Sequence, residues 1–179
     1  MKIALYLGSF NPFHNGHLKV IQQALSDFKM DKVVIVPTMQ NPWKKEKVLD
    51  IDKRFDIIIN SIFIEPIIKS LKLFSNKRLF IDLIEKELIP PYYSYSTLHA
   101  LKNKYCNDEI FILCGEDTIK DIPDWMNGEA IIRDYDFIVV NRFSWDISSS
   151  QIRGYVKLDK DISKFVSPNV INLIKKYYK

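Results

Sequence analysis

The sequence has few of the features that mark disulfide-rich, metal-binding or membrane proteins. Only two of its 179 residues are cysteines, Cys106 and Cys114, and their spacing matches neither a CxxC pair nor a zinc site. Two thiols without a disulfide framework are typical of a reducing compartment. No apolar run is long enough to cross a bilayer, and Met1–Leu7 lacks the apolar length and cleavage site of a signal peptide. We therefore expect a cytoplasmic protein with no membrane contact.

A large excess of either charge is also absent. The formal net charge is +4 and the pI is about 8.9. This mild excess suits a protein that handles phosphates, and it is too small for the basic stripe typical of nucleic-acid binders. Hydrophobic residues make up 47% of the chain, which is enough for a compact core. No linker or repeat interrupts the sequence, so we predict a single domain over residues 1–179, with no nucleic-acid partner and an open oligomeric state.

Short apolar runs alternate with amphipathic segments along the whole chain. Strands are expected at Lys2–Leu7, Lys32–Val36, Lys77–Leu83, Glu109–Cys114 and Tyr135–Val140. Helices are expected at His17–Phe28, Asp52–Phe63, Ser94–Tyr105, Ser148–Val156 and Pro168–Tyr178. Serines should cap the helix that begins at Ser94. The alternation predicts an α/β fold, a Rossmann-like parallel sheet with helices on both faces.

The string GSFNPFHNGHL, residues 8–18, follows the first expected strand and opens the first helix. Ligands of such sheets bind at the carboxyl ends of strands, where a helix N-terminus offers N–H groups to an anion. Gly8 and Gly16 should allow the backbone to approach closely. His14 and His17 can face one cleft and stabilise charge on a phosphate during its transfer. Two histidines at this spacing would also suit a surface turn or part of a zinc site.

The complete string resembles the HxGH signature of the nucleotidyltransferase superfamily, and most of all that of bacterial nicotinate-nucleotide adenylyltransferases. The resemblance implies a nucleotidyltransferase-type fold and transfer of AMP from ATP to nicotinate mononucleotide, which yields deamido-NAD and pyrophosphate. The partners would be these two nucleotides. Mg²⁺ should arrive on ATP as the cofactor, because the sequence shows no carboxylate cage that would hold the ion.

A second motif, ISSSQIR at residues 147–153, resembles the ISSTxIR box of the same family. A serine run before an amphipathic helix is a capping signal. The same hydroxyl and N–H groups can cradle a triphosphate, and Arg153 can add a fork of donors. Plain capping beside a surface arginine is the alternative.

The loop PTMQNPWK, residues 37–44, resembles the family loop that usually ends Pro-His-Lys. Lys44 matches the family lysine that reaches phosphates, although Trp43 replaces the usual histidine, and a basic surface loop is the alternative. Arg54 matches a family arginine, and a solvated or salt-bridged structural role fits it equally well.

Two further stretches resemble the acceptor site of the family. PYYSYSTL at 91–98 is similar to PSYTxDTL, and Gly115, Asp117 and Trp125 are similar to a GxD…LPxW segment. The resemblance implies that the pyridine ring stacks on Trp125 and that Ser94 meets the nicotinate carboxylate. The alternatives are a core tryptophan on a helix face and a helix cap at Asp117.

Together the motifs imply four catalytic residues, eleven ATP-binding residues and four acceptor-binding residues, with no metal ligand. The catalytic group is His14, His17, Lys44 and Arg153. The ATP-binding group is Gly8, Ser9, Phe10, Gly16, Gly115, Asp117, Arg142, Ile147, Ser148, Ser149 and Ser150. The acceptor group is Asn11, Tyr93, Ser94 and Trp125.

The short link between Arg142 and Ser148 leaves rival functions open. The stretch SWDISSS, residues 144–150, also resembles pantetheine-phosphate adenylyltransferase of coenzyme A biosynthesis. Nicotinamide mononucleotide is a second possible acceptor, because it differs only by an amide in place of the carboxylate. A nucleotide-sensing domain without activity is the non-enzyme alternative, since a fold does not fix a function.

Overall fold

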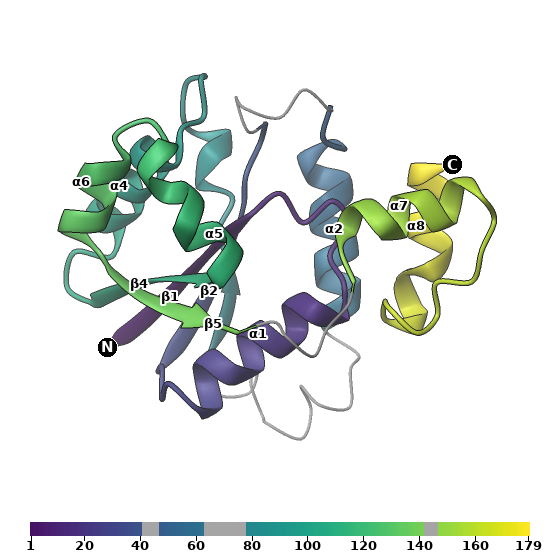
Figure 1. Ribbon diagram of the computed structural model, residues 1–179, viewed down its shortest axis with the longest axis horizontal. Helices are drawn as coiled ribbons and strands as arrows, with labels where there is room; N and C mark the ends of the chain where they lie inside the picture. Colours follow the sequence, from purple (N-terminus) through teal and green to yellow (C-terminus); the bar gives the residue numbers. More distant parts are fainter. Residues whose placement is uncertain (41–46, 63–77, 142–146) are drawn as a thin grey trace.

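The computed structural model describes residues 1–40, 47–62, 78–141 and 147–179. In these residues five strands form one sheet in the order β3-β2-β1-β4-β5, and every neighbouring pair is parallel (Figure 1). The predicted Rossmann-like sheet is therefore confirmed. The strands are β1 (Lys2–Gly8), β2 (Lys32–Pro37), β3 (Leu79–Ile81), β4 (Glu109–Gly115) and β5 (Asp136–Val140).

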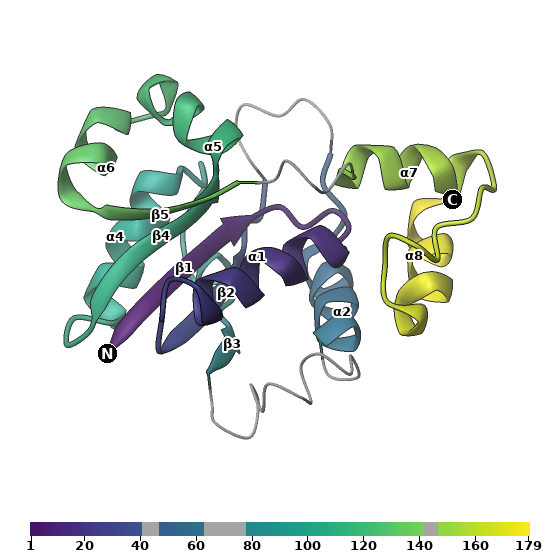
Figure 2. The same cartoon turned by 60° about the horizontal axis from the view of Figure 1, so that its bottom comes forward.

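Both faces of the sheet are covered, because alternate side chains of each strand point to opposite cores. In β1, Ala4 and Tyr6 enter one core, whereas Ile3 and Leu5 enter the other. The first core also takes residues from α1 (Asn15–Ser26), α2 (Ile51–Ile62), α7 (Ser149–Lys157) and α8 (Ile171–Tyr178). The second takes residues from α4 (Ser94–Lys104) and α6 (Gly128–Asp134), and Figure 2 shows the two helical layers.

Sequence periodicity placed the long helices to within about two residues and missed the short ones. The segments α5 (Glu116–Asp121) and α6 are six and seven residues long, too short for a helical period to appear. The final predicted helix is divided into a 3₁₀ turn, Pro168–Val170, and α8. The predicted serine cap of α4 is wrong, because Tyr93 occupies the N-cap position and no side chain bonds the helix end. Further 3₁₀ turns span Ile84–Lys86 and Ile122–Asp124.

The strand order reverses between β1 and β4, which creates the crevice where doubly wound sheets bind ligands. The chain runs from β1 toward β3 on one side of this point, and from β4 to β5 on the other. The loop after β1 and helix α5 after β4 therefore face each other at the carboxyl edge of the sheet. No helix within the described ranges is both long and apolar enough to span a membrane.

Arg54 lies in α2 with only 1% of its surface exposed, among the largest fully buried side chains of the described chain. Its guanidinium nitrogens donate to the carbonyl oxygens of Leu49 at 2.6 Å, Ser9 at 2.6 Å and Met39 at 3.2 Å. Burial lowers the pKa of Arg54, and nearby Tyr178 and Glu85 partly offset that effect. The sequence left two roles open for Arg54, that of the family arginine and a solvated or salt-bridged structural role. The structure shows a structural role, in which the side chain is buried and not solvated.

The burial of Arg54 predicts that Arg54→Met lowers the free energy of unfolding by about 3–5 kcal/mol, because three carbonyls lose their donor and the buried Glu85 carboxylate loses a nearby compensating charge. Arg78→Met is the matched control. Arg78 also donates to three carbonyls, those of Asp31, Leu25 and Met30, but its side chain is half-exposed. Urea denaturation should therefore give the control a loss of only about 1 kcal/mol. Equal losses in the two variants would contradict a special role for Arg54.

Candidate active site

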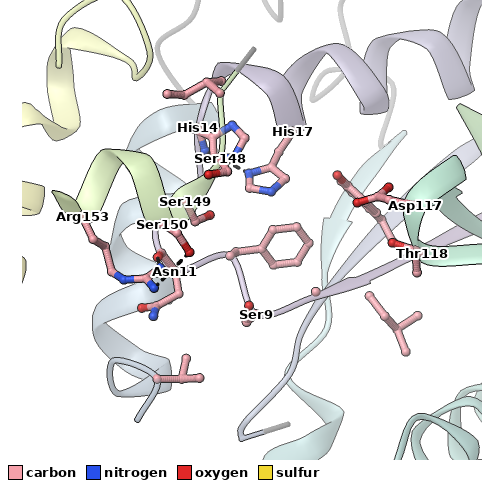
Figure 3. Close-up of a pocket in the computed structure, with 16 residues that line it drawn as sticks. Ser9, Asn11, His14, His17, Asp117, Thr118, Ser148, Ser149, Ser150 and Arg153 are labelled. Atoms are coloured by element: carbon pink, nitrogen blue, oxygen red, sulfur yellow. Dashed lines mark hydrogen bonds between the residues drawn. The ribbon is translucent and has the colours of Figure 1, made fainter. Parts of the chain in front are cut away.

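A hollow of about 590 Å³ opens at the carboxyl ends of β1 and β4. Its walls come from the loop after β1, the start of α1, the start of α5 and the start of α7 (Figure 3). The structure therefore brings the two phosphate motifs, far apart in the sequence, to one place. Twelve of the predicted site residues line this hollow, namely Gly8, Ser9, Phe10, Asn11, His14, His17, Asp117, Ile147, Ser148, Ser149, Ser150 and Arg153.

His14 and His17 form a reciprocal capping box at the N-terminus of α1. The Nδ1 atom of His14 accepts from the Gly16 N–H at 3.2 Å, and that of His17 accepts from the His14 N–H at 3.1 Å. Because both Nδ1 atoms are acceptors, the hydrogen of each neutral ring is on Nε2. The capping geometry thus selects the tautomer with the hydrogen on Nε2, a nitrogen of the kind that can donate to a phosphate oxygen.

Aromatic packing fixes the orientation of the two imidazoles. Their centroids are 3.7 Å apart, and His14 is only 7% exposed. The His17 ring stacks on Phe13 at 5.1 Å and meets the edge of Phe10 at 5.0 Å. Phe10 itself has a positive φ of 44°, an uncommon conformation that turns its ring into this cluster. The predicted nucleotide contact of Phe10 is therefore also a structural support for His17.

The two glycines of the motif make room for side chains within the loop. A Cβ atom at Gly16 would lie 2.9 Å from Cε1 of His14, and one at Gly8 would lie 3.0 Å from the Phe10 ring. The Gly16 N–H is also occupied by the cap. Gly16 does not line the hollow, and its predicted approach to the nucleotide stays a prediction.

The N-terminus of α7 completes the hollow and is bonded to the β1 loop. Ser148 caps the helix by accepting from the Gln151 N–H at 3.2 Å, so the predicted cap is present. The Ser149 hydroxyl donates to the carbonyl oxygen of Pro12 at 2.8 Å. Arg153 donates to the carbonyl oxygen of Asn11 at 2.8 Å and to the Ser150 hydroxyl at 3.2 Å (Figure 3). The N-terminus of α7 therefore faces the same concave space as the imidazoles of His14 and His17, an arrangement suited to a polyanion.

Asn11 is largely used by the protein itself. Its Oδ1 atom accepts from the Leu49 N–H at 3.2 Å and from the Tyr178 hydroxyl at 2.6 Å. Burial raises the pKa of Tyr178, so this hydroxyl stays a donor at neutral pH. Two donors fill the two lone pairs of Oδ1, which leaves the side-chain NH₂ as the group that a ligand can reach.

A second hollow, of about 630 Å³, adjoins the first and shares Gly8, Ser9, Asp117 and Thr118 with it. Ser94 at the start of α4 and Trp125 after the Ile122–Asp124 turn line this space. Trp125 is half-buried and follows a 3₁₀ turn instead of lying on a helix face, but it also packs against the second core, so its stacking role stays a prediction.

Some predicted site residues lie elsewhere, and some lining residues were missed. Gly115 and Tyr93 are N-caps and line neither hollow, and Asp117 lies in the first turn of α5, whose N-cap is Gly115. Lys44, Arg142 and Trp43 lie outside the described residues. Thr118, Asp121 and Asp124 line the second hollow but were not among the residues predicted from the sequence. Their position just after the apolar run of β4 was the available signal.

Among the residues that the structure describes, no cluster of three His, Cys, Asp or Glu could hold a metal.

The cytidylyltransferase-like family model matches residues 5–155, so the chain belongs to this family. A Fusobacterium nucleatum protein named "Probable nicotinate-nucleotide adenylyltransferase" is 32% identical over 99% of this chain and 99% of its own length. A Flavobacterium johnsoniae protein of the same name is 31% identical over 98% of this chain and 87% of its own. The sequence-based assignment to the nicotinate-nucleotide adenylyltransferase family is thus confirmed.

A solved structure supports the same fold. Plasmodium falciparum nicotinic acid mononucleotide adenylyltransferase, complexed with NaAD, matches with a TM-score of 0.78 and 20% identity. The match covers 98% of this chain and 95% of that one. At this identity the likeness establishes the shared architecture of the two proteins.

His14 caps α1 and is also predicted to donate to a phosphate, so substitutions at this position can test the two roles separately. His14→Ser keeps an N-cap oxygen but removes the outer donor, so turnover with ATP should fall by about 10²–10³-fold at an unchanged melting temperature. His14→Ala should lose the same activity and, in addition, about 1 kcal/mol of stability. Steady-state kinetics and thermal melts measure both effects. Near-normal turnover of a folded His14→Ser variant would exclude the proposed donor.

Proposed function

We propose that the protein transfers AMP from ATP to nicotinate mononucleotide, producing deamido-NAD and pyrophosphate in the biosynthesis of NAD. The observation that carries the proposal is the convergence of the α7 N-terminus and the two imidazoles at the start of α1 on one hollow. That hollow is continuous with a second one that offers an aromatic ring and a hydroxyl. The pair matches the two nucleotides of the reaction, and the relatives' names favour the nicotinate acceptor over phosphopantetheine.

In the proposed reaction the phosphate oxygen of the mononucleotide attacks the α-phosphorus of ATP in line. The bond from that phosphorus to the bridging oxygen breaks, and pyrophosphate leaves with the electron pair. No covalent enzyme intermediate forms, so catalysis rests on position and on charge stabilisation. The Nε2–H groups of His14 and His17 would donate to the phosphate oxygens as charge develops. Lys44 is proposed as an additional cation in this group.

The triphosphate of ATP would lie across the N-terminus of α7. The backbone N–H groups of Ser149 and Ser150, together with the Arg153 guanidinium, would bind its outer phosphates. Mg²⁺ bound to ATP would neutralise part of the charge on these phosphates. Asp117 is the carboxylate that lines the hollow and could meet a water of that ion. Asp117 and Thr118 also belong to the second hollow, so they mark the border at which the two nucleotides would meet.

The acceptor would bind in the second hollow, with its pyridine ring on Trp125. This ring carries a positive charge in a mononucleotide, and the carboxylates of Asp121 and Asp124 line the same space. An aromatic face and nearby carboxylates both favour a flat cation. The N-terminus of α4 at Ser94 would bind the nicotinate carboxylate through N–H and hydroxyl donors. The cytoplasm is the proposed location.

Acceptor choice is tested by pyrophosphate release with ATP and each of three acceptors. We expect nicotinate mononucleotide to give the highest kcat/KM, because Ser94 and the α4 N-terminus offer donors to its carboxylate. Nicotinamide mononucleotide should be slower. A higher kcat/KM with nicotinamide mononucleotide would overturn the acceptor, and one with phosphopantetheine would overturn the pathway. No turnover with any of the three would favour a sensing domain.

Stacking predicts a selective effect of Trp125. Trp125→Ala should raise KM for the pyridine nucleotide by roughly tenfold or more, since loss of base–aromatic stacking costs about 1–3 kcal/mol. The KM for ATP should stay nearly constant, and Trp125→Phe should recover much of the loss. A melting temperature measured alongside separates this from a packing role. A large fall in stability with both KM values raised together would indicate that Trp125 has a packing role in the core and not a stacking role.

A further inference from the structure

A third hollow, of about 580 Å³, lies on the far side of Arg153 from the acceptor site. Its walls are the N-terminal region of α2, the outer face of α7 and the end of α8, and Figure 1 shows these three helices side by side. It shares Asn11, Val48 and Arg153 with the phosphate hollow. No motif of the sequence analysis pointed to this space.

Positive charge is concentrated around this third hollow. Among the residues that the structure describes, Lys47, Lys53, Arg153 and Lys157 line it, against one side-chain carboxylate, that of Asp50. Arg153 and Lys157 are four residues apart in α7, so they lie on one face of the helix. Like charges gathered around a concavity repel one another unless an anion lies between them.

The other charged groups of the described lining offset only part of this excess. Lys179 also lines the hollow, but it pairs with Asp159 at 3.2 Å. The Asp50 carboxylate accepts from the Asp52 N–H at 2.9 Å, as a cap of α2. Three of the four remaining cations are exposed lysines on flexible stems, which suit a mobile polyanion better than a fixed planar group.

The aromatic residues of the hollow are already engaged. The Tyr178 hydroxyl donates to Asn11, and the Lys53 ammonium lies 5.4 Å from the centroid of the Tyr177 ring. A nucleobase would therefore displace an existing contact in order to stack there. A compact anion without a base needs no such displacement.

We propose that this hollow is a second anion site that binds inorganic pyrophosphate, separate from the ATP phosphates. The site is defined by Lys53 and Lys157, which belong to no part of the proposed catalytic group. Arg153 forms the wall between the two hollows, so a pyrophosphate released from ATP would pass from one set of cations to the next. This last role rests on the proposed function, whereas binding of the anion does not.

The test is calorimetric titration of pyrophosphate into protein saturated with α,β-methylene-ATP, which keeps the phosphate hollow filled. Wild type should bind pyrophosphate under these conditions. The double variant Lys53→Gln/Lys157→Gln should raise the dissociation constant by roughly tenfold or more, since each lysine supplies one charged contact. Lys160→Gln is the matched control: Lys160 is exposed, lies three residues beyond Lys157 and does not line the hollow, so its variant should bind like wild type.

Three results would overturn the assignment. The first is loss of pyrophosphate binding when the ATP analogue is present, which would place the anion in the phosphate hollow. The second is an unchanged dissociation constant in the double variant. The third is tighter binding of ADP than of pyrophosphate with the same dependence on both lysines, which would make the hollow a nucleotide site. The titration requires that the phosphate hollow binds the ATP analogue but not that the protein turns over, so a failure of the turnover assays alone does not affect the interpretation of this measurement.

Discussion

The buried guanidinium of Arg54 joins the three segments that shape the phosphate hollow. Its three carbonyl partners belong to the loop after β1, the loop after β2 and the residues just before α2. None of these segments has a regular backbone ladder at that point, so the carbonyl groups need a donor from elsewhere. One side chain supplies all three bonds. The position of Ser9, and with it the loop that leads to His14, therefore depends on a residue that does not line the hollow.

Glu85 extends this polar cluster to the acceptor side. Its carboxylate accepts from the Met39 N–H at 2.5 Å and from the Thr97 hydroxyl at 2.7 Å. The Met39 residue is thus held at its carbonyl by Arg54 and at its N–H by Glu85. Thr97 lies in the first turn of α4, close behind Ser94, so the cluster connects the β2 loop to the acceptor hollow. Burial raises the pKa of Glu85, and the bonds from Thr97 and Met39 and the charge of Arg54 oppose that rise.

The fold and the location of the site could be predicted from the sequence because both depend on local signals. Buried strands such as KVVIV and the glycine-bounded histidine motif are readable from short windows. Arg54 was not decidable in this way, because its neighbours Asp52, Lys53 and Asp56 read as a solvated helix face. Its burial follows from α2 lying against two loops distant in the sequence. The cationic third hollow could not be predicted from the sequence for the same reason, because its lysines come from separate elements.

The histidine pair shows why capping and phosphate binding are not competing explanations. A serine at position 14 would also cap α1, but its single side-chain oxygen would then be used in the hydrogen bond to the helix N-terminus. Imidazole has two ring nitrogens, so one can satisfy the helix N-terminus while the other faces the hollow. The cap also fixes which nitrogen carries the hydrogen, and the ring cannot rotate without breaking the cap. Donors held in this way need little reorganisation when charge develops on a phosphate, which is the condition for effective electrostatic stabilisation. The same chemistry that begins the helix would therefore prepare the proposed site, and at α7 the capping box of Ser148 and Gln151 does not use the N–H groups of Ser149 and Ser150, which are proposed to bind the same anion.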